Sequence, residues 1–287
     1  MKRVLILGSN GLLGYAIYNF LLNKKNVELY SLSRKTNHFK KNKKIKKLNF
    51  FVKNKINNKI KDEINTLKPN IVINCIGITK NKNTSKKNYF LVNSKFPIFL
   101  SKLSERKGFK FVHISTDCVF NGLKGDYKEA NKVNAKDIYG LSKIRGEYLG
   151  SNTTILRTSV IGHSIKRGNG LLEWFLNQSK EINGFNQAYF TGPTSLEISK
   201  IIYNYLILEN KIPNEIVNIG LKKISKYTLL KILKKIYKKN IKIIKYSNFK
   251  IDRSLNTNYF RRITKHKILT WEKAIKQEKL FFSKIRK

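Results

Sequence analysis

Strand-like segments alternate with amphipathic segments through the first half of the chain. The strand-like segments, most of them continuous apolar runs, cover residues 4–7, 27–34, 70–77, 110–116 and 153–162. Those with helical periodicity cover residues 15–25, 60–69, 91–106 and 139–150. Continuous apolar runs of this length are typical of strands buried on both faces of a parallel sheet. The alternation therefore predicts an α/β fold with a doubly wound, mostly parallel sheet.

A glycine-rich turn, GSNGLLG, lies directly between the first predicted strand and the first predicted helix. Gly8 would permit the tight turn, Gly11 would let the backbone approach a pyrophosphate, and Gly14 would let the helix pack closely on the strand. The alternative is a purely structural turn. Its position between a strand and a helix favours a dinucleotide-binding Rossmann fold, with the helix N-terminus available to the phosphates.

The end of the second predicted strand bears on which dinucleotide would bind. NAD-binding proteins usually carry an acidic residue there for the ribose 2′-hydroxyl. This chain has Arg34 in that region, and a guanidinium favours a 2′-phosphate through charge-assisted hydrogen bonds. The sequence therefore predicts NADPH, with NADH left as the alternative.

The second half of the chain has a different texture. Helical patterns at 196–208 and 226–239 and a strand-like run at 215–221 are separated by longer irregular stretches. We predict a dinucleotide-binding domain over residues 1–162 and a mainly substrate-binding region over 163–287. Some segments of the second region are expected to return to the sheet. The two would meet at the carboxyl edge of the sheet, where open α/β sheets bind ligands.

The charge balance is extreme, with 60 Lys and Arg against 17 Asp and Glu and a net charge of +43. Clustered cations of this kind can bind nucleic acid. The lysines are, however, spread along the whole chain and interleaved with asparagine, as in residues 80–88. We therefore expect no nucleic-acid function, although the charge could steer an anionic small molecule towards its site.

Cysteine and histidine usage points to neither disulfides nor a metal. Cys75 and Cys118 lie in apolar runs and the four histidines are scattered, so no disulfide framework and no metal-ligand spacing is present. No apolar run approaches the length of a membrane span. The sequence predicts a cytoplasmic protein that takes no metal and does not enter the membrane; its oligomeric state is left open, a homodimer included.

Tyr139 and Lys143 lie four positions apart and would share one helix face. Such a pair is common by chance in a lysine-rich chain, but beside a nicotinamide it could donate a proton during reduction. Carbonyl reduction needs a proton donor for the developing alkoxide. We expect the ammonium group to lower the pKa of the phenol, and Thr116, at the end of strand 110–116, to hold the substrate oxygen beside it.

Seven stretches in this order resemble the extended short-chain dehydrogenase/reductase family, and within it the dTDP-4-dehydrorhamnose reductase group. They are GSNGLLG (8–14), NCIG (74–77), VNSKFP (92–97), STDCVFNGLKGDYKE (115–129), YGLSKIRGE (139–147), LRTSVIG (156–162) and DRSLN (252–256). The resemblance implies a doubly wound fold and reduction of a nucleotide-activated 4-keto sugar by NADPH or NADH. It also implies a role in making sugars for surface polysaccharides.

The resemblance also implies roles for individual residues. Tyr139 is similar to the family's proton donor, Lys143 to its activator and ribose ligand, and Thr116 to the hydroxyl that orients the ketone. Asn93 is similar to an asparagine that supports a water relay, with a simple helix-entry cap as the alternative. The remaining cofactor-binding positions would be Gly8, Asn10, Gly11, Leu12 and Gly14 at the pyrophosphate, Arg34 at the 2′-phosphate, and Cys75, Ile76 and Gly77 at the ribose.

The substrate pocket departs from the family pattern. Cys118 stands where the rhamnose-pathway reductases carry a tyrosine, and Val160 where they carry a tryptophan, so we expect a smaller or differently shaped sugar. Asp117 lies beside Cys118, and Arg167 and Arg253 are candidate ligands for the substrate's diphosphate, with solvated surface cations as the alternative. The acidic residue usual after the third strand is missing from residues 49–55, which leaves adenine binding open.

Three other functions remain open from the sequence. A nucleotide-sugar epimerase could use the same tyrosine. A dehydratase is disfavoured because the related dehydratases carry Asp-Glu after the threonine, whereas Cys118 follows Asp117 here. A non-catalytic nucleotide-binding regulatory subunit is disfavoured by the presence of Thr116, Tyr139 and Lys143.

Overall fold

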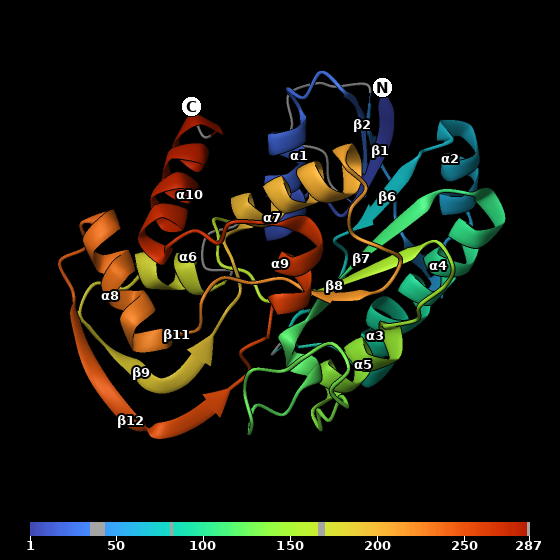
Figure 1. The fold of residues 1–287 in the computed structure, drawn as a ribbon. Helices are drawn as coiled ribbons and strands as arrows, with labels where there is room; N and C mark the ends of the chain where they lie inside the picture. Colours follow the sequence, from blue (N-terminus) through green and yellow to red (C-terminus); the bar gives the residue numbers. More distant parts are fainter. Residues whose placement is uncertain (35–43, 81–82, 166–169, 286–287) are drawn as a thin grey trace.

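A sheet of seven parallel strands forms the centre of the protein (Figure 1), as seen in a computed structural model that describes residues 1–34, 44–80, 83–165 and 170–285. The strand order is β10-β8-β7-β6-β1-β2-β3, and every neighbouring pair is parallel. The strands are β1 (Lys2–Leu7), β2 (Val27–Ser33), β3 (Ile45–Lys47), β6 (Ile71–Asn74), β7 (Lys110–Thr116), β8 (Thr153–Thr158) and β10 (Ile216–Asn218). This arrangement confirms the predicted doubly wound α/β fold.

Helices cover both faces of this sheet because its strands are apolar on both sides. Val4 and Ile6 of β1 belong to a core shared with α1 (Leu12–Leu21) and α7 (Ser195–Ile202). Leu5 and Leu7 point to the opposite face and pack with α2 (Lys59–Leu67) and α4 (Phe96–Lys107). None of the helices within the described ranges is long and apolar enough to cross a membrane.

The first helix differs from the prediction of residues 15–25, because α1 begins at Leu12 and ends at Leu21. Gly11 is its N-cap, with φ −77° and ψ 162°, so the helix starts within the glycine turn itself. At the other end the N–H of Lys24 bonds to the carbonyl of Leu21. The lysines therefore lie in the turn to β2, not in the last helical turn.

The helix predicted at 91–106 is longer and is interrupted. It consists of α3 (Lys86–Phe90), a π-helical turn η1 (Leu91–Lys95) and α4 in succession. The hydroxyl of Ser85 caps α3 by accepting the N–H of Asn88 at 3.2 Å. Single π-helical turns inside longer helices are frequent at functional sites, and this one contains Asn93.

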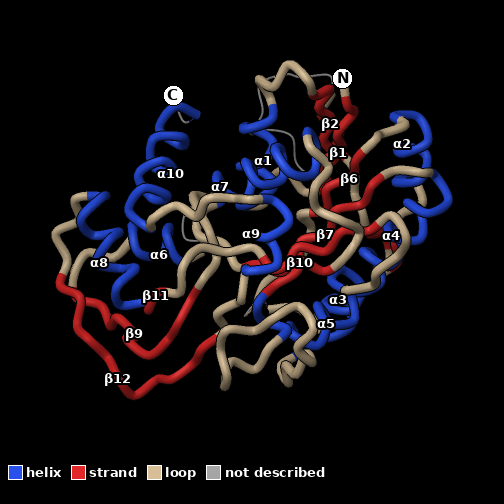
Figure 2. The backbone as a smooth tube through the Cα atoms, viewed as in Figure 1, coloured by secondary structure: helices blue, strands red, loops and turns tan. Residues whose placement is uncertain are grey.

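A second, smaller layer is built from the later half of the chain (Figure 2). Its three strands, β11 (Ile224–Ser225), β9 (Glu181–Phe190) and β12 (Lys242–Asp252), pack with α6 (Leu171–Leu176), α8 (Lys226–Tyr237) and α10 (Trp271–Ile285) around a separate apolar core. The remaining elements are a small hairpin of β4 (Phe51–Val52) and β5 (Lys55–Ile56), the turn η2 (Asp117–Val119), α5 (Ile138–Gly146), the π-helical η3 (Tyr203–Leu208) and α9 (Asn258–Thr264).

Elements of the later half also complete the central sheet. The strand β10 pairs with β8, with Ile216 opposite Ile155, and α7 packs against α1 (Figure 1). The boundary between residues 162 and 163 stays a prediction about domains, but the chain on its far side contributes both a strand and a covering helix to the sheet.

Candidate active site

The glycine turn closes tightly against the end of β6. Gly8 has φ +86°, and a Cβ atom on it would lie 2.8 Å from the Ile76 side chain. A Cβ atom on Gly14 would lie 2.3 Å from the carbonyl oxygen of Gly8, so Gly14 is required for α1 to pack on the end of β1. A larger residue at Gly14 would displace backbone rather than a flexible side chain, and one at Gly8 would also have to adopt a positive φ.

A cavity of about 1060 Å³ opens beside this turn at the carboxyl edge of the sheet. Seven predicted cofactor residues line it: Gly8, Asn10, Gly11, Arg34, Cys75, Ile76 and Gly77. Its volume lies at the upper end of the range for small-molecule sites, and the helix N-terminus at Gly11 gives it an anion-binding side. The residues present therefore fit a dinucleotide.

Part of the cavity wall comes from residues 49–55, the segment that lacks the acidic residue usually found after the third strand. Asn49, Phe50, Phe51, Lys53 and Asn54, around the β4–β5 hairpin, line the cavity together with Ile165 and residues of α3 and η1. An apolar and amide-rich wall, rather than a carboxylate, thus faces this end of the cavity.

Leu12, Gly14 and Asn93 are not among the cavity-lining residues. The Asn93 side chain lies behind the wall, where its oxygen accepts the N–H of Ile78 at 2.8 Å. Its amide group donates to the Ile78 carbonyl at 2.9 Å and to the Ser142 hydroxyl at 3.0 Å. Asn93 therefore joins the cavity-lining Ile78 to helix α5, and its side chain shows no cap on a helix N–H.

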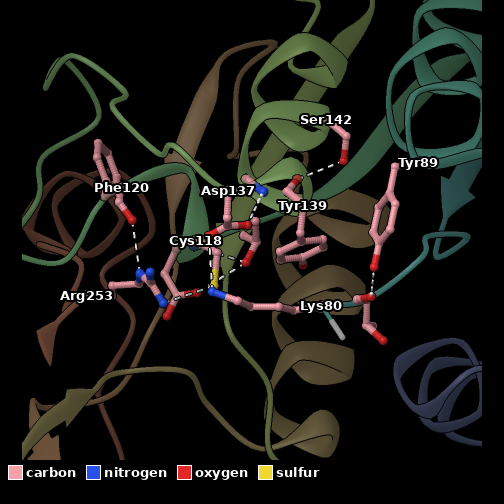
Figure 3. A network of polar contacts seen from close by, with 12 residues as sticks. Lys80, Tyr89, Cys118, Phe120, Asp137, Tyr139, Ser142 and Arg253 are labelled. Atoms are coloured by element: carbon pink, nitrogen blue, oxygen red, sulfur yellow. Dashed lines mark hydrogen bonds and ion pairs between the residues drawn. The ribbon is translucent and has the colours of Figure 1, made fainter. Parts of the chain in front are cut away.

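Helix α5 presents Tyr139 towards the end of β7 (Figure 3). The helix begins there because the Asp137 side chain accepts the N–H of Gly140 at 3.0 Å and caps it. The Thr116 hydroxyl lies close enough to the Tyr139 phenol to affect its pKa, and it also accepts the N–H of Cys118 at 3.1 Å. The two hydroxyl groups are thus brought together at the carboxyl edge of the sheet.

Lys143 follows one turn later and is buried. Its ammonium group donates a hydrogen bond to the Ile114 carbonyl at 2.8 Å. Burial lowers the pKa of Lys143 from 10.5 to about 8, and the Glu147 carboxylate partly opposes this. Neither Lys143 nor Tyr139 is among the residues lining the large cavity.

The expectation that Lys143 lowers the pKa of Tyr139 is wrong for this structure. Burial of the phenol raises the pKa of Tyr139 above 10, and the nearby Thr116 hydroxyl offsets only part of the rise. The desolvation penalty on a phenolate is the largest effect on this pKa. The Lys143 ammonium is directed at a backbone carbonyl instead. Tyr139 therefore holds its proton at neutral pH, as a proton donor must.

A buried ion pair behind α5 was not predicted. Arg157 of β8 and Glu147 are joined by two hydrogen bonds, of 2.7 and 2.9 Å, and each side chain is only 4% exposed. The Ser115 hydroxyl donates to the same carboxylate at 2.6 Å. The pair ties the end of α5 to β7 and β8, and it places a negative charge near Lys143. Ser115 is thereby directed away from Thr116 and Tyr139.

The predicted substrate residues have different surroundings. Asp117 is buried and accepts a hydrogen bond from Thr116 at 3.1 Å. Burial raises the pKa of Cys118 to about 12, so this residue is a neutral thiol. Val160 is partly buried against the core of α1 and α7, and Arg167 lies outside the described residues.

Cations near Asp117 and Cys118 were hidden in the sequence by the abundance of lysine. Arg253, which was predicted, directs Nη1 towards the Cys118 sulfur at 3.8 Å. Lys80 forms an ion pair with Asp137 at 3.1 Å (Figure 3). Lys226, at the start of α8, interacts electrostatically with Asp117 and Cys118. The sequence predicts only a helix over residues 226–239 and no role for Lys226.

Curated proteins with similar sequences include a reductase and a polysaccharide biosynthesis protein. A curated dTDP-4-dehydrorhamnose reductase of Aggregatibacter actinomycetemcomitans is 29% identical over 234 residues, which is 77% of this chain and 72% of that protein. The spore coat polysaccharide biosynthesis protein SpsK of Bacillus subtilis is 31% identical over 172 residues, and the matched part spans only 55% of that protein.

The fold is also found among solved structures. A crystal structure of dTDP-4-dehydrorhamnose reductase from Bacillus anthracis in complex with NADP aligns with a TM-score of 0.80. The alignment covers 98% of this chain and 99% of that one, at 20% identity. In addition, the family model described as the RmlD substrate binding domain matches residues 1–189. Since this match includes well over half of the sequence, the chain belongs to the RmlD substrate binding domain family.

Proposed function

We propose that the protein uses NADPH to reduce the keto group of a nucleotide-activated 4-keto deoxy-sugar, as a step in making surface polysaccharide. The observation that carries this proposal is the proximity of the Thr116 and Tyr139 hydroxyl groups at the carboxyl edge of the sheet. A glycine-lined cavity large enough for a dinucleotide opens at the same edge. The family and the reductase relatives support the substrate class.

The chemistry follows from the protonation states of the side chains. When bound, NADPH supplies a hydride to the carbonyl carbon. A carbonyl oxygen lying against Thr116 and Tyr139 is within reach of both hydroxyl groups. The phenol keeps its proton at neutral pH because burial raises its pKa, and it releases that proton only to an oxygen that gains negative charge. Lys143 keeps the first turns of α5 in place through the Ile114 carbonyl.

Substitution of Arg34 tests whether the protein prefers NADPH to NADH. Arg34 lies at the exposed rim of the cavity, directly after Ser33, whose hydroxyl accepts a hydrogen bond from Asn10 at 2.9 Å. Replacing Arg34 with Ala should weaken NADPH binding by about 10-fold or more, because a charge-assisted hydrogen bond to a 2′-phosphate is lost. Fluorescence titration with NADPH and NADH measures this, and NADH is the internal control because it lacks only the 2′-phosphate. Equal weakening of both would contradict the assignment.

The function itself is tested with substrates. Purified protein with NADPH should oxidise the cofactor, followed as loss of its absorbance, when given at least one member of a panel of nucleotide-linked 4-keto sugars. Stoichiometric loss of NADPH separates a reductase from an epimerase, which regenerates its cofactor in each turnover. Binding of these compounds without any turnover, with either cofactor, would instead favour a regulatory subunit.

A further inference from the structure

Two cations from the second layer reach the loop that follows β7. Arg253 lies just beyond the end of β12 and is held by a hydrogen bond from its Nε to the Phe120 carbonyl at 3.0 Å (Figure 3). Its Nη1 points to the Cys118 sulfur. The guanidinium group is therefore fixed beside Cys118, two residues along the chain from Thr116.

Lys226 reaches the same loop from another element. It is the first residue of α8, and its ammonium group lies over the Phe190 ring, 3.7 Å from the centroid. The side chain is partly buried, which lowers its pKa to about 8, while the Asp117 carboxylate favours its charged form. The ammonium is thus turned towards the Asp117–Cys118 loop rather than into solvent.

The neighbouring lysines form ion pairs, but these two cations do not. Lys80 is paired with Asp137, and Lys223 with Asp252. Within the described parts of the chain, no carboxylate lies at ion-pair distance from Lys226 or Arg253. Burying a cation without a directly paired carboxylate costs free energy. Asp117 offsets only part of the cost for Lys226, and an anionic ligand at this place would offset more of it.

The position of the pair fits a particular part of the substrate. If a C4 carbonyl lies against Thr116 and Tyr139, the anomeric carbon lies across the sugar ring from it and carries the diphosphate. We propose that Lys226 and Arg253 together bind this diphosphate, with Lys226 as a specificity-determining residue for the charged nucleotide sugar. The assignment rests on the proposed function for the identity of the ligand, but it can be tested without turnover.

The test uses ligands that bear a diphosphate but cannot react. The full-length protein is saturated with NADP⁺, so that the dinucleotide cavity is filled, and is titrated in a calorimeter with thymidine diphosphate, uridine diphosphate and the two nucleosides. Replacing Lys226 with Met should weaken binding of the better diphosphate by about 10-fold or more, the usual scale for a charged hydrogen bond. Affinity for the corresponding nucleoside should not change.

Lys223→Met is the matched control. Lys223 also lies over an aromatic ring of β9, that of Tyr189, but its charge is already paired with Asp252. It should leave diphosphate affinity nearly unchanged. The proposal is overturned if wild-type protein binds neither diphosphate, if Lys226→Met binds diphosphate as tightly as wild type, or if it loses nucleoside and NADP⁺ affinity equally, which would indicate a structural role. Selective loss of diphosphate affinity without turnover of any keto sugar would retain this inference and reject the reductase.

Discussion

Replacing Tyr139 with Phe should lower kcat by about 10²–10⁴-fold, the usual contribution of a positioned general acid. The change removes the phenolic oxygen that lies near Thr116 and keeps the aromatic ring. Affinity for NADPH should stay close to that of wild type. Stopped-flow and steady-state absorbance measurements with the best substrate of the panel give kcat, and fluorescence titration gives the cofactor affinity.

Tyr89→Phe is the control for this experiment. Tyr89 is also buried near the site, and its hydroxyl donates to the Thr79 carbonyl at 3.1 Å (Figure 3). Its removal costs a hydrogen bond but no proton donor, so kcat should change little. Full activity of Tyr139→Phe, or an equal loss in both variants, would show that another group protonates the product.

Replacing Arg157 with Met should lower the free energy of unfolding by about 3–5 kcal/mol, because the buried Glu147 would lose its partner. The same change also removes a hydrogen bond to the Glu129 carbonyl and a cation–π contact with Phe120. Urea unfolding followed by circular dichroism measures the loss. Adding Glu147→Gln to the variant should recover part of it, because the unpaired charge is then removed.

Arg3→Met provides the comparison. Arg3 pairs with Glu28 at 3.2 Å, but the side chains are 47% and 21% exposed, so its loss should cost less than about 1 kcal/mol. Similar costs for the two variants would mean that Arg157 and Glu147 contribute no more than a surface pair does.

The central fold was predictable because its signals are local. The segment 110–116 coincides with β7 because its apolar run is buried on both faces, and the glycine spacing marks the turn after β1. The strands β9 and β12 were missed for a physical reason. β12 is exposed over most of its length, so no buried face imposes an alternation, and β9 contains two Asn and a Gly, which are poor strand formers.

The features of the site that the sequence did not predict are those that depend on tertiary structure. Nothing local distinguishes Lys226 from the other cations of the chain, since its inward direction is set by the strand β9 beneath it. The pairing of Arg157 with Glu147 joins a strand to a helix end. The pKa of Tyr139 has the opposite direction from the expected one because burial, which the spacing of Tyr139 and Lys143 does not encode, is the largest effect on it.

The strand β10 is synthesised about 60 residues after β8, the strand with which it pairs, and this affects how the sheet is completed during folding. Until residues 216–218 leave the ribosome, the outer edge of β8 has unpaired backbone groups, and open edges of this kind promote pairing between chains. A fragment that stops near residue 162 would carry that exposed edge permanently. Chimeras with relatives should therefore be joined after β10, so that the strand and the sheet it completes come from one parent.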